Sequence, residues 1–137
     1  RILDDLGLLP AADWMAEDLA KNCGIDAQVK VIGGERSLPA ELELLLFRIV
    51  QEALNNIRRH SEASRAWITI EFGDGKVILA VRDDGKGFKL PKRIGDLASA
   101  GKLGLAGMQE RARLIEGKLT IKSAPTKGTT VTVEVPV

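Results

Sequence analysis

Three polar residues, Glu52, Asn56 and His60, follow one another at intervals of four in a segment with a helical pattern. Side chains four residues apart lie one above another on an α-helix, so we expect a ladder of a carboxylate, an amide and an imidazole. Polar groups at the border of an apolar face are costly unless a partner satisfies them. A hard cation such as Mg²⁺ carrying phosphates would do so, because Mg²⁺ takes oxygen ligands and keeps several waters. The alternative is an ordinary solvated helix edge.

The helix that carries this ladder is predicted over residues 42–60. Its apolar residues recur at intervals of three and four, the pattern of a helix with one buried face. They are Leu42, Leu45, Leu46, Ile49, Val50, Ala53, Leu54 and Ile57. Pro39 is expected in the first turn, with Ser37 as the N-cap candidate.

A second group of interest is Asp83, Gly85 and Gly87, at the end of a nearly continuous apolar strand. An unpaired carboxylate is costly at such a position. It could accept a hydrogen bond from an amino group such as that of adenine, with the two glycines leaving room for a flat ring. A plain hairpin turn is the alternative, but the residues after Phe88 do not alternate as a returning strand would.

A cluster of glycines at residues 101–107 precedes another predicted helix. Backbone N–H groups and the helix dipole make such an end suitable for phosphate, although glycines before a helix are also common as plain loop residues. The cluster matches neither the dinucleotide fingerprint, which needs a strand directly before it, nor a P-loop. Thr129, after Gly128 at the start of the last strand, adds a hydroxyl that could face a base.

The remaining elements follow from periodicity and turn residues. A helix is expected between Pro10 and Gly24 with Ala11, Trp14, Met15 and Leu19 facing inward, and another over residues 104–116 with Met108, Ala112 and Ile115 inward. Alternating or continuous apolar runs predict strands at residues 28–32, 66–72, 76–83, 118–123 and 129–135, with turns at 73–75 and 124–128. The irregular stretch 89–103 is expected to form a mobile lid.

This order of elements predicts an α/β (α+β) fold, a two-layer sandwich with helices packed on one face of a mixed, mostly antiparallel sheet. The 137 residues suffice for one domain, and 45% hydrophobic residues favour a globular one. A net charge of +1 and 4% aromatic residues argue against a nucleic-acid partner. A single cysteine, Cys23, excludes an internal disulfide and suits a reducing compartment. We see no signal peptide or membrane-spanning run, so we expect a cytoplasmic domain without direct membrane contact.

Four motifs in order now support a resemblance. They are Glu52-x-x-x-Asn56-x-x-x-His60, Asp83-x-Gly85-x-Gly87, Gly104-Leu105-x-Gly107-Met108 and Gly128-Thr129. Together they resemble the N, G1, G2 and G3 boxes of the ATP-binding catalytic domain of a two-component sensor histidine kinase. This is the GHKL superfamily, with the Bergerat ATP-binding fold. LDDLGLLPA, FRIVQEALNNIRRH and GLAGMQERARLIEG are similar to the branch that pairs with NarL/LuxR-type response regulators.

The resemblance implies a role for each matching residue. Asn56, with Glu52, would hold Mg²⁺, and Glu52 would help position or polarise the reacting groups. Asp83 would receive the adenine amino group, with Gly85, Gly87 and Thr129 beside the base. The remaining nucleotide contacts are expected from Arg59, His60, Gly104, Leu105, Gly107 and Met108. The branch often has a Gly-His-Gly-Leu-like run where this chain has Lys102-Leu103-Gly104-Leu105, so Lys102 is only a candidate for the γ-phosphate.

The resemblance also implies partners. His60, the only histidine, lies within the expected nucleotide site, so the phosphoacceptor histidine is expected on a separate dimerisation domain. Residues 1–9 resemble the tail of a linker from that domain, and residues 10–137 the catalytic domain. The phosphoryl group would pass to a response regulator, and the fragment alone is expected to be monomeric. The family is compatible with a membrane-anchored full-length protein.

Four alternatives stay open at this point. Other GHKL ATPases, such as MutL, gyrase B or heat-shock chaperone domains, are longer and continue into a transducer segment. An anti-sigma-factor serine kinase has the same fold, but the QEALNNIRRH wording argues against it. A nucleotide-sensing module without transfer activity would not need Glu52 and Asn56 together. A plain structural domain would have to carry the four motifs by chance.

Overall fold

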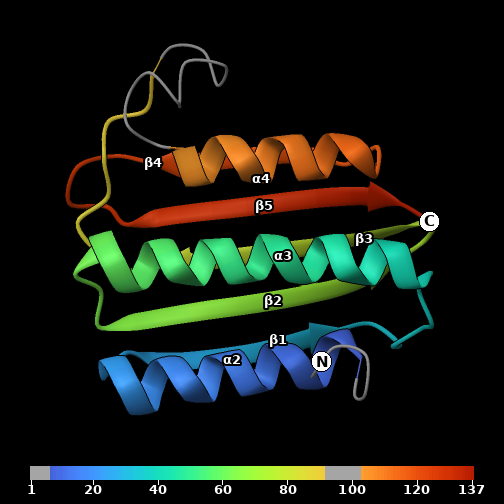
Figure 1. Cartoon of the computed structure of the whole chain (residues 1–137), viewed down its shortest axis with the longest axis horizontal. Helices are drawn as coiled ribbons and strands as arrows, with labels where there is room; N and C mark the ends of the chain where they lie inside the picture. Colours follow the sequence, from blue (N-terminus) through green and yellow to red (C-terminus); the bar gives the residue numbers. More distant parts are fainter. Residues whose placement is uncertain (1–6, 92–102) are drawn as a thin grey trace.

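The computed structural model describes residues 7–91 and 103–137. The elements within these ranges follow the predicted order of helix, strand, helix, two strands, helix and two strands (Figure 1). They are α2 (Leu8–Cys23), β1 (Asp26–Ile32), α3 (Ala40–Asn56), the π-helical turn η1 (Ile57–Ser61), β2 (Arg65–Gly73), β3 (Lys76–Asp83), α4 (Leu103–Leu114), β4 (Lys118–Ser123) and β5 (Thr129–Pro136).

The strands form one five-stranded sheet in the order β1-β2-β3-β5-β4. β1 pairs with β2 in parallel, and the other three pairs are antiparallel. Helices α2, α3 and α4 lie side by side over one face of this sheet (Figure 1). The prediction of a two-layer α/β sandwich on a mixed, mostly antiparallel sheet is therefore confirmed.

The core lies between the two layers. Alternate residues of β2 and β3 are buried, because side chains of a strand point to opposite faces and only one face is covered by helices. The predicted apolar face of α3 packs against them, with Leu46, Ile49 and Val50 at most 1% exposed. The largest completely buried side chains thus come from the central helix and the central strands, which fixes α3 over the middle of the sheet.

The ends of α3 differ from the prediction. The α-helix stops at Asn56, and the chain continues as the π-helical turn η1 until Glu62 adopts a left-handed conformation. The predicted α-helix to His60 is therefore wrong in its last turn. Ser37 is not the N-cap: Pro39 occupies that position, without a side-chain capping hydrogen bond.

The inward face of α2 was predicted correctly except at Trp14. Ala11, Met15 and Leu19 are buried, whereas Trp14 is 52% exposed. Leu8 is buried at the start of the helix, so the helix begins before Pro10. The boundary drawn at residue 9 stays a prediction, and residues 1–6 lie outside the described residues.

On α4, Met108 and Ala112 are buried as predicted, and Ile115, just beyond the helix, is half-buried. Most of the predicted lid, residues 92–102, lies outside the described residues. None of the helices in residues 7–91 and 103–137 has the length and apolar composition that crossing a bilayer requires.

Candidate functional site

A row of four residues crosses the sheet at one end. Ala66 of β2 pairs with Asp83 of β3, Asp83 with Thr129 of β5, and Thr129 with Ser123 of β4. All four lie on the sheet face that the helices cover, because they are in phase with the buried residues of their strands. Strand pairing therefore brings the Asp83 carboxylate together with two hydroxyls, of Ser123 and Thr129, that come much later in the sequence.

Asp83 is the charged residue at the centre of this row. Its side chain is only 4% exposed, and its Oδ1 accepts a hydrogen bond from the backbone N–H of Gly85 at 2.8 Å. Burial raises the pKa of the Asp83 carboxyl above 3.8, while hydrogen bonds from the backbone N–H groups of Gly85 and Thr129 partly oppose that rise. A buried carboxylate with few partners is a typical acceptor for a ligand.

The loops beside Asp83 are held together by two glycines. Gly87 has φ +62°, and a Cβ there would lie 2.1 Å from the carbonyl oxygen of Ala124. Gly128 has φ +74°, and a Cβ there would lie 2.1 Å from the carbonyl oxygen of Asp83. The close backbone packing of these loops accounts for both glycines without a ligand, so the predicted role of Gly87 beside a flat ring stays a prediction.

The predicted polar ladder meets the start of α4. A Cβ built on Gly104 would lie 2.8 Å from Oε2 of Glu52 and 3.2 Å from Oδ1 of Asn56. Two oxygens from successive turns of α3 therefore converge on the N-terminal turn of α4. The Nδ2 of Asn56 is buried and finds no hydrogen-bond partner in the described part of the chain. An unsatisfied buried amide is costly, which marks this junction as a functional candidate.

The other predicted residues are distributed as follows. The side chains of Leu105 and Met108 are buried in the core, at 4% and 0% exposure, so any contact they make with a ligand would come from the backbone. Arg59 is exposed in η1, and His60 follows it in the same π-helical turn. Gly107 lies on α4, and Lys102 lies outside the described residues.

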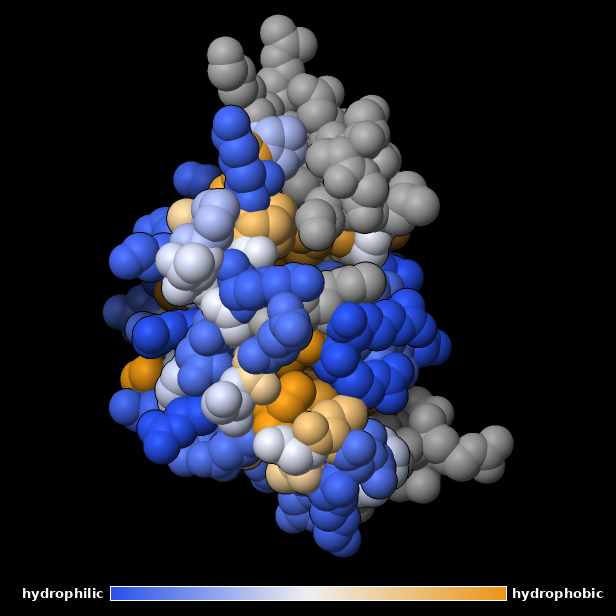
Figure 2. All heavy atoms as spheres, turned by 90° about the vertical axis from the view of Figure 1, so that its left-hand side faces the viewer, coloured by the Kyte–Doolittle hydropathy of each residue, from blue (hydrophilic) through white to orange (hydrophobic). Residues whose placement is uncertain are grey.

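Both parts of the candidate site lie at one end of the molecule. The C-terminal end of α3, the N-terminal end of α4, the end of β3 and the start of β5 meet at the left of Figure 1. Figure 2 views the molecule from this end, where hydrophobic residues are visible between hydrophilic ones. The fold therefore places the Asp83 row and the Glu52–Asn56 pair on the same end face.

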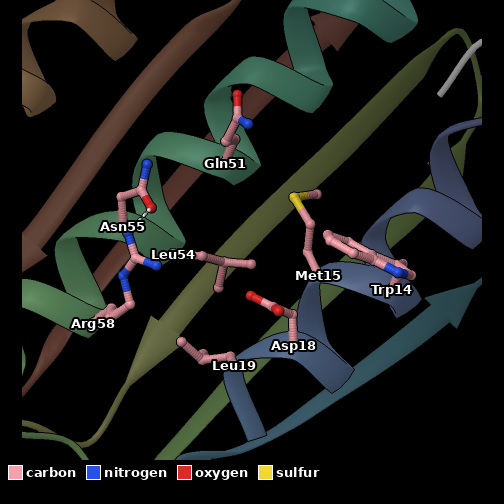
Figure 3. A pocket seen from close by; sticks show the side chains of 8 residues that line it. All are labelled: Trp14, Met15, Asp18, Leu19, Gln51, Leu54, Asn55 and Arg58. Atoms are coloured by element: carbon pink, nitrogen blue, oxygen red, sulfur yellow. Dashed lines mark hydrogen bonds between the residues drawn. The ribbon is translucent and has the colours of Figure 1, made fainter. Parts of the chain in front are cut away.

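A separate groove of about 210 Å³ lies between α2 and α3. Figure 3 shows the side chains of Met15, Leu19 and Leu54 between the two helices, with the Asp18 carboxylate among them. On α3, the Arg58 guanidinium donates a hydrogen bond to Oδ1 of Asn55 at 3.1 Å. None of the predicted site residues lines this groove. Its lining consists of Trp14, Met15, Asp18, Leu19, Gln51, Leu54, Asn55 and Arg58.

Sequence reasoning missed Ser123. Its Oγ lies 2.9 Å from Oγ1 of Thr129 and 3.0 Å from the carbonyl oxygen of Gly128, and it accepts a hydrogen bond from the N–H of Phe88 at 2.9 Å. A serine at the end of an alternating strand looks ordinary in a sequence. Its only available signal was the strand register that places it opposite Thr129.

Comparison with known proteins identifies the family of this chain. The model of the histidine kinase-, DNA gyrase B-, and HSP90-like ATPase family matches residues 41–137. The signal transduction histidine-protein kinase/phosphatase DegS of Brevibacillus brevis is 37% identical over 135 residues, which cover 98% of this chain and 34% of that protein. The oxygen sensor histidine kinase NreB of Staphylococcus carnosus is 36% identical over 135 residues, which cover 98% of this chain and 38% of that protein.

Solved structures show the same fold. The histidine kinase domain of the blue-light activated histidine kinase of Erythrobacter litoralis EL346 superimposes with a TM-score of 0.66 at 21% identity, over 92% of this chain and 64% of that one. The chain spans about a third of the length of the two curated relatives above. The predicted family is thus confirmed: this chain belongs to the histidine kinase-, DNA gyrase B- and HSP90-like ATPases, as an ATP-binding domain of the sensor histidine kinase type.

Proposed function

We propose that this domain binds Mg-ATP across the end face formed by α3, α4, β3 and β5, and presents the γ-phosphoryl group to a histidine outside this chain. The observation that carries the proposal is the convergence at this end of a buried carboxylate, Asp83, and a pair of oxygen donors, Glu52 and Asn56. A nucleotide needs a hydrogen-bonding group for its base at one end of the site and oxygen donors that hold a metal ion on its phosphates at the other end.

Asp83 would accept a hydrogen bond from the exocyclic amino group of adenine. The Asp83 carboxylate can accept further hydrogen bonds, because the backbone N–H groups satisfy it only in part, and this supports the assignment. Thr129 lies next to it in register and would contact the same edge of the base, with Gly85 and Gly87 in the adjoining loop. The proposed base pocket therefore depends on the pairing of β3 with β5.

Mg²⁺ would be held by Asn56 and Glu52 together with the phosphates, and when bound it would neutralise charge on them. The described residues contain no cluster of three or more His, Cys, Asp or Glu that could hold a metal alone. Two oxygen donors and a substrate phosphate suit Mg²⁺, which usually keeps several waters. Backbone N–H groups of Gly104 and Leu105 would face the phosphates in the first turn of α4. Gly107 and Met108 follow this turn, and their N–H groups bond within the helix, so we do not propose them as phosphate donors. Arg59, His60 and Lys102 are further candidates for phosphate contacts.

The phosphoacceptor would be a histidine on a dimerisation domain of the same kinase, with a response regulator, of the NarL/LuxR type, as the next acceptor. Catalysis by the present residues would consist of positioning and charge neutralisation. We further propose that the domain acts in the cytoplasm. Support for transfer to a histidine comes from the relatives, which are histidine kinases such as DegS and NreB.

Calorimetric titration with ADP and a non-hydrolysable ATP analogue, each with and without Mg²⁺, tests the proposal. Asp83→Asn should abolish binding of either nucleotide while circular dichroism shows an intact fold. Asn56→Ala should weaken Mg-dependent binding and leave adenosine binding unchanged. Tight binding by Asp83→Asn would refute the base pocket, and equal losses of ADP and adenosine binding in Asn56→Ala would refute the metal role. Adding the dimerisation domain of a relative such as DegS then tests transfer, and binding without transfer would favour a nucleotide-sensing module.

A further inference from the structure

The hydroxyl of Ser123 has three neighbours and one proton. Its Oγ lies within hydrogen-bond distance of the Phe88 nitrogen, the Gly128 carbonyl oxygen and the Thr129 hydroxyl. A serine hydroxyl donates one hydrogen bond and accepts two. The three contacts therefore use its complete hydrogen-bonding capacity.

The identity of the neighbours fixes the direction of each bond. The Phe88 N–H can only donate, so Ser123 accepts there. The Gly128 carbonyl can only accept, so the proton of Ser123 is directed to it. Ser123 then has no proton left for Thr129, and the Thr129 hydroxyl must donate its own proton to Ser123.

A Thr129 hydroxyl whose proton is committed offers only lone pairs to a ligand. Asp83, its neighbour in the sheet, is also an acceptor when ionised. The row Asp83–Thr129 therefore presents acceptors alone. Where it faces the C6 substituent of a purine, such an edge suits an amino group and repels a carbonyl oxygen, because two acceptors that face each other leave both without a proton.

We propose that Ser123 is a positioning residue that sets the base specificity of the site by holding the Thr129 hydroxyl as an acceptor. The inference rests on the proposed nucleotide site and adds a specificity determinant to it. Ser123 contacts no ligand in this account and acts through Thr129. It also ties the β4 end to the Phe88 segment and to the β4–β5 turn, so that both walls of the base pocket share one anchor.

The test compares ADP with IDP, whose bases differ at C6, an amino group or a carbonyl oxygen, and at the adjacent N1, a lone pair or an N–H. The intact chain should bind ADP at least tenfold more tightly. Ser123→Ala frees the Thr129 proton, so the ratio of the two dissociation constants should fall about fivefold or more, the value of about one hydrogen bond. Ser123→Thr retains the hydroxyl and should restore the ratio.

Two further variants complete the design. In a Thr129→Val background, Ser123→Ala should leave the ratio unchanged, because the group through which it acts is gone. Thr130→Val is the matched control, since Thr130 lies on the same strand but on the opposite sheet face, and its ratio should equal that of the intact chain. An unchanged ratio in Ser123→Ala, or equal ADP and IDP binding by the intact chain, would overturn the inference. No ADP binding at all by the intact chain would instead overturn the proposed function.

Discussion

Gly128→Ala should break the link between the β4–β5 turn and the end of β3. At this position the added Cβ would lie 2.1 Å from the carbonyl oxygen of Asp83, whereas ordinary van der Waals contact begins at 3.4 Å. The obstacle is backbone, so no side-chain rotation can relieve it. Either β5 moves away from β3 at this end or the Gly128 conformation changes.

The free energy cost has two parts. A φ of +74° costs an L-residue about 1–2 kcal/mol, and forcing extra volume into a packed site costs about 1–3 kcal/mol. The expected loss in the free energy of unfolding is therefore about 2–5 kcal/mol. Because Asp83 and Thr129 both border the displaced backbone, ADP affinity should also fall by about tenfold, the equivalent of about 1.4 kcal/mol.

Gly75→Ala is the matched control. Gly75 also has a positive φ, +66°, but a Cβ there meets nothing within 4 Å. This variant should lose only the backbone part of the free energy, about 1–2 kcal/mol, and retain ADP binding. The difference in the free energy of unfolding between the two variants isolates the cost of the contact with the Asp83 carbonyl oxygen.

Equilibrium urea unfolding supplies the free energies, and calorimetric titration with ADP supplies the affinities. The m-value should stay the same in both variants if the folded and unfolded states keep their compactness. A Gly128→Ala protein no less stable than Gly75→Ala would refute the reasoning, because the close approach to Asp83 would then cost nothing.

Three further predictions concern other parts of the same end. Gly104→Ala should weaken Mg-dependent ADP binding about tenfold or more, because the added Cβ displaces the Glu52 carboxylate. Thermal stability should stay equal or rise slightly, because alanine favours the helix. An equal loss of ADP affinity in calorimetry without Mg²⁺ would contradict this. Thr126→Asn should raise the free energy of unfolding by about 1 kcal/mol in urea, since a β-branched residue at φ +68° is strained, and no gain would argue against strain. Asp84 accepts backbone hydrogen bonds, the one from Arg65 first, that lower the pKa of its carboxyl below 3.8. Its stabilising effect is therefore complete above the unfolded-state pKa near 3.8 and is lost as the pH falls through the lower folded-state pKa. Asp84→Asn should flatten this acid-induced decline in the urea midpoint.

The sequence predicted what depends on local patterns. The bounds of β3 and β4 follow from a nearly continuous apolar run, from alternation and from turn residues, and both were found as predicted. The hairpin predicted at residues 73–75 is present, with Gly73 as the last residue of β2 and its turn at residues 74–75. The buried face of α3 follows from a 3.6-residue period, as Ile49 and Val50 show. These features need no knowledge of what lies across the core.

What the sequence did not predict depends on partners distant in the chain. Ile57 continues the apolar period of α3 and is buried, so nothing in the pattern signals that the helix changes to a π-helical turn at this residue. Trp14 has the apolar character of a core residue, but it is 52% exposed and lines the groove between α2 and α3. Ser123 gained its significance only from the register that places it beside Thr129. The roles of the individual site residues remain proposals.

The strand order has a consequence for how this domain is made. β5 comes last among the described strands, yet it occupies an interior place in the sheet, between β3 and β4. During synthesis, β4 would emerge from the ribosome before the strand that attaches it to the rest of the sheet. The row from Ala66 to Ser123 can close only after residue 129 and its neighbours are available. A nascent chain would therefore complete the proposed base pocket only after β5 has emerged, and a chain shortened before Thr129 would lose the middle of its sheet instead of an edge.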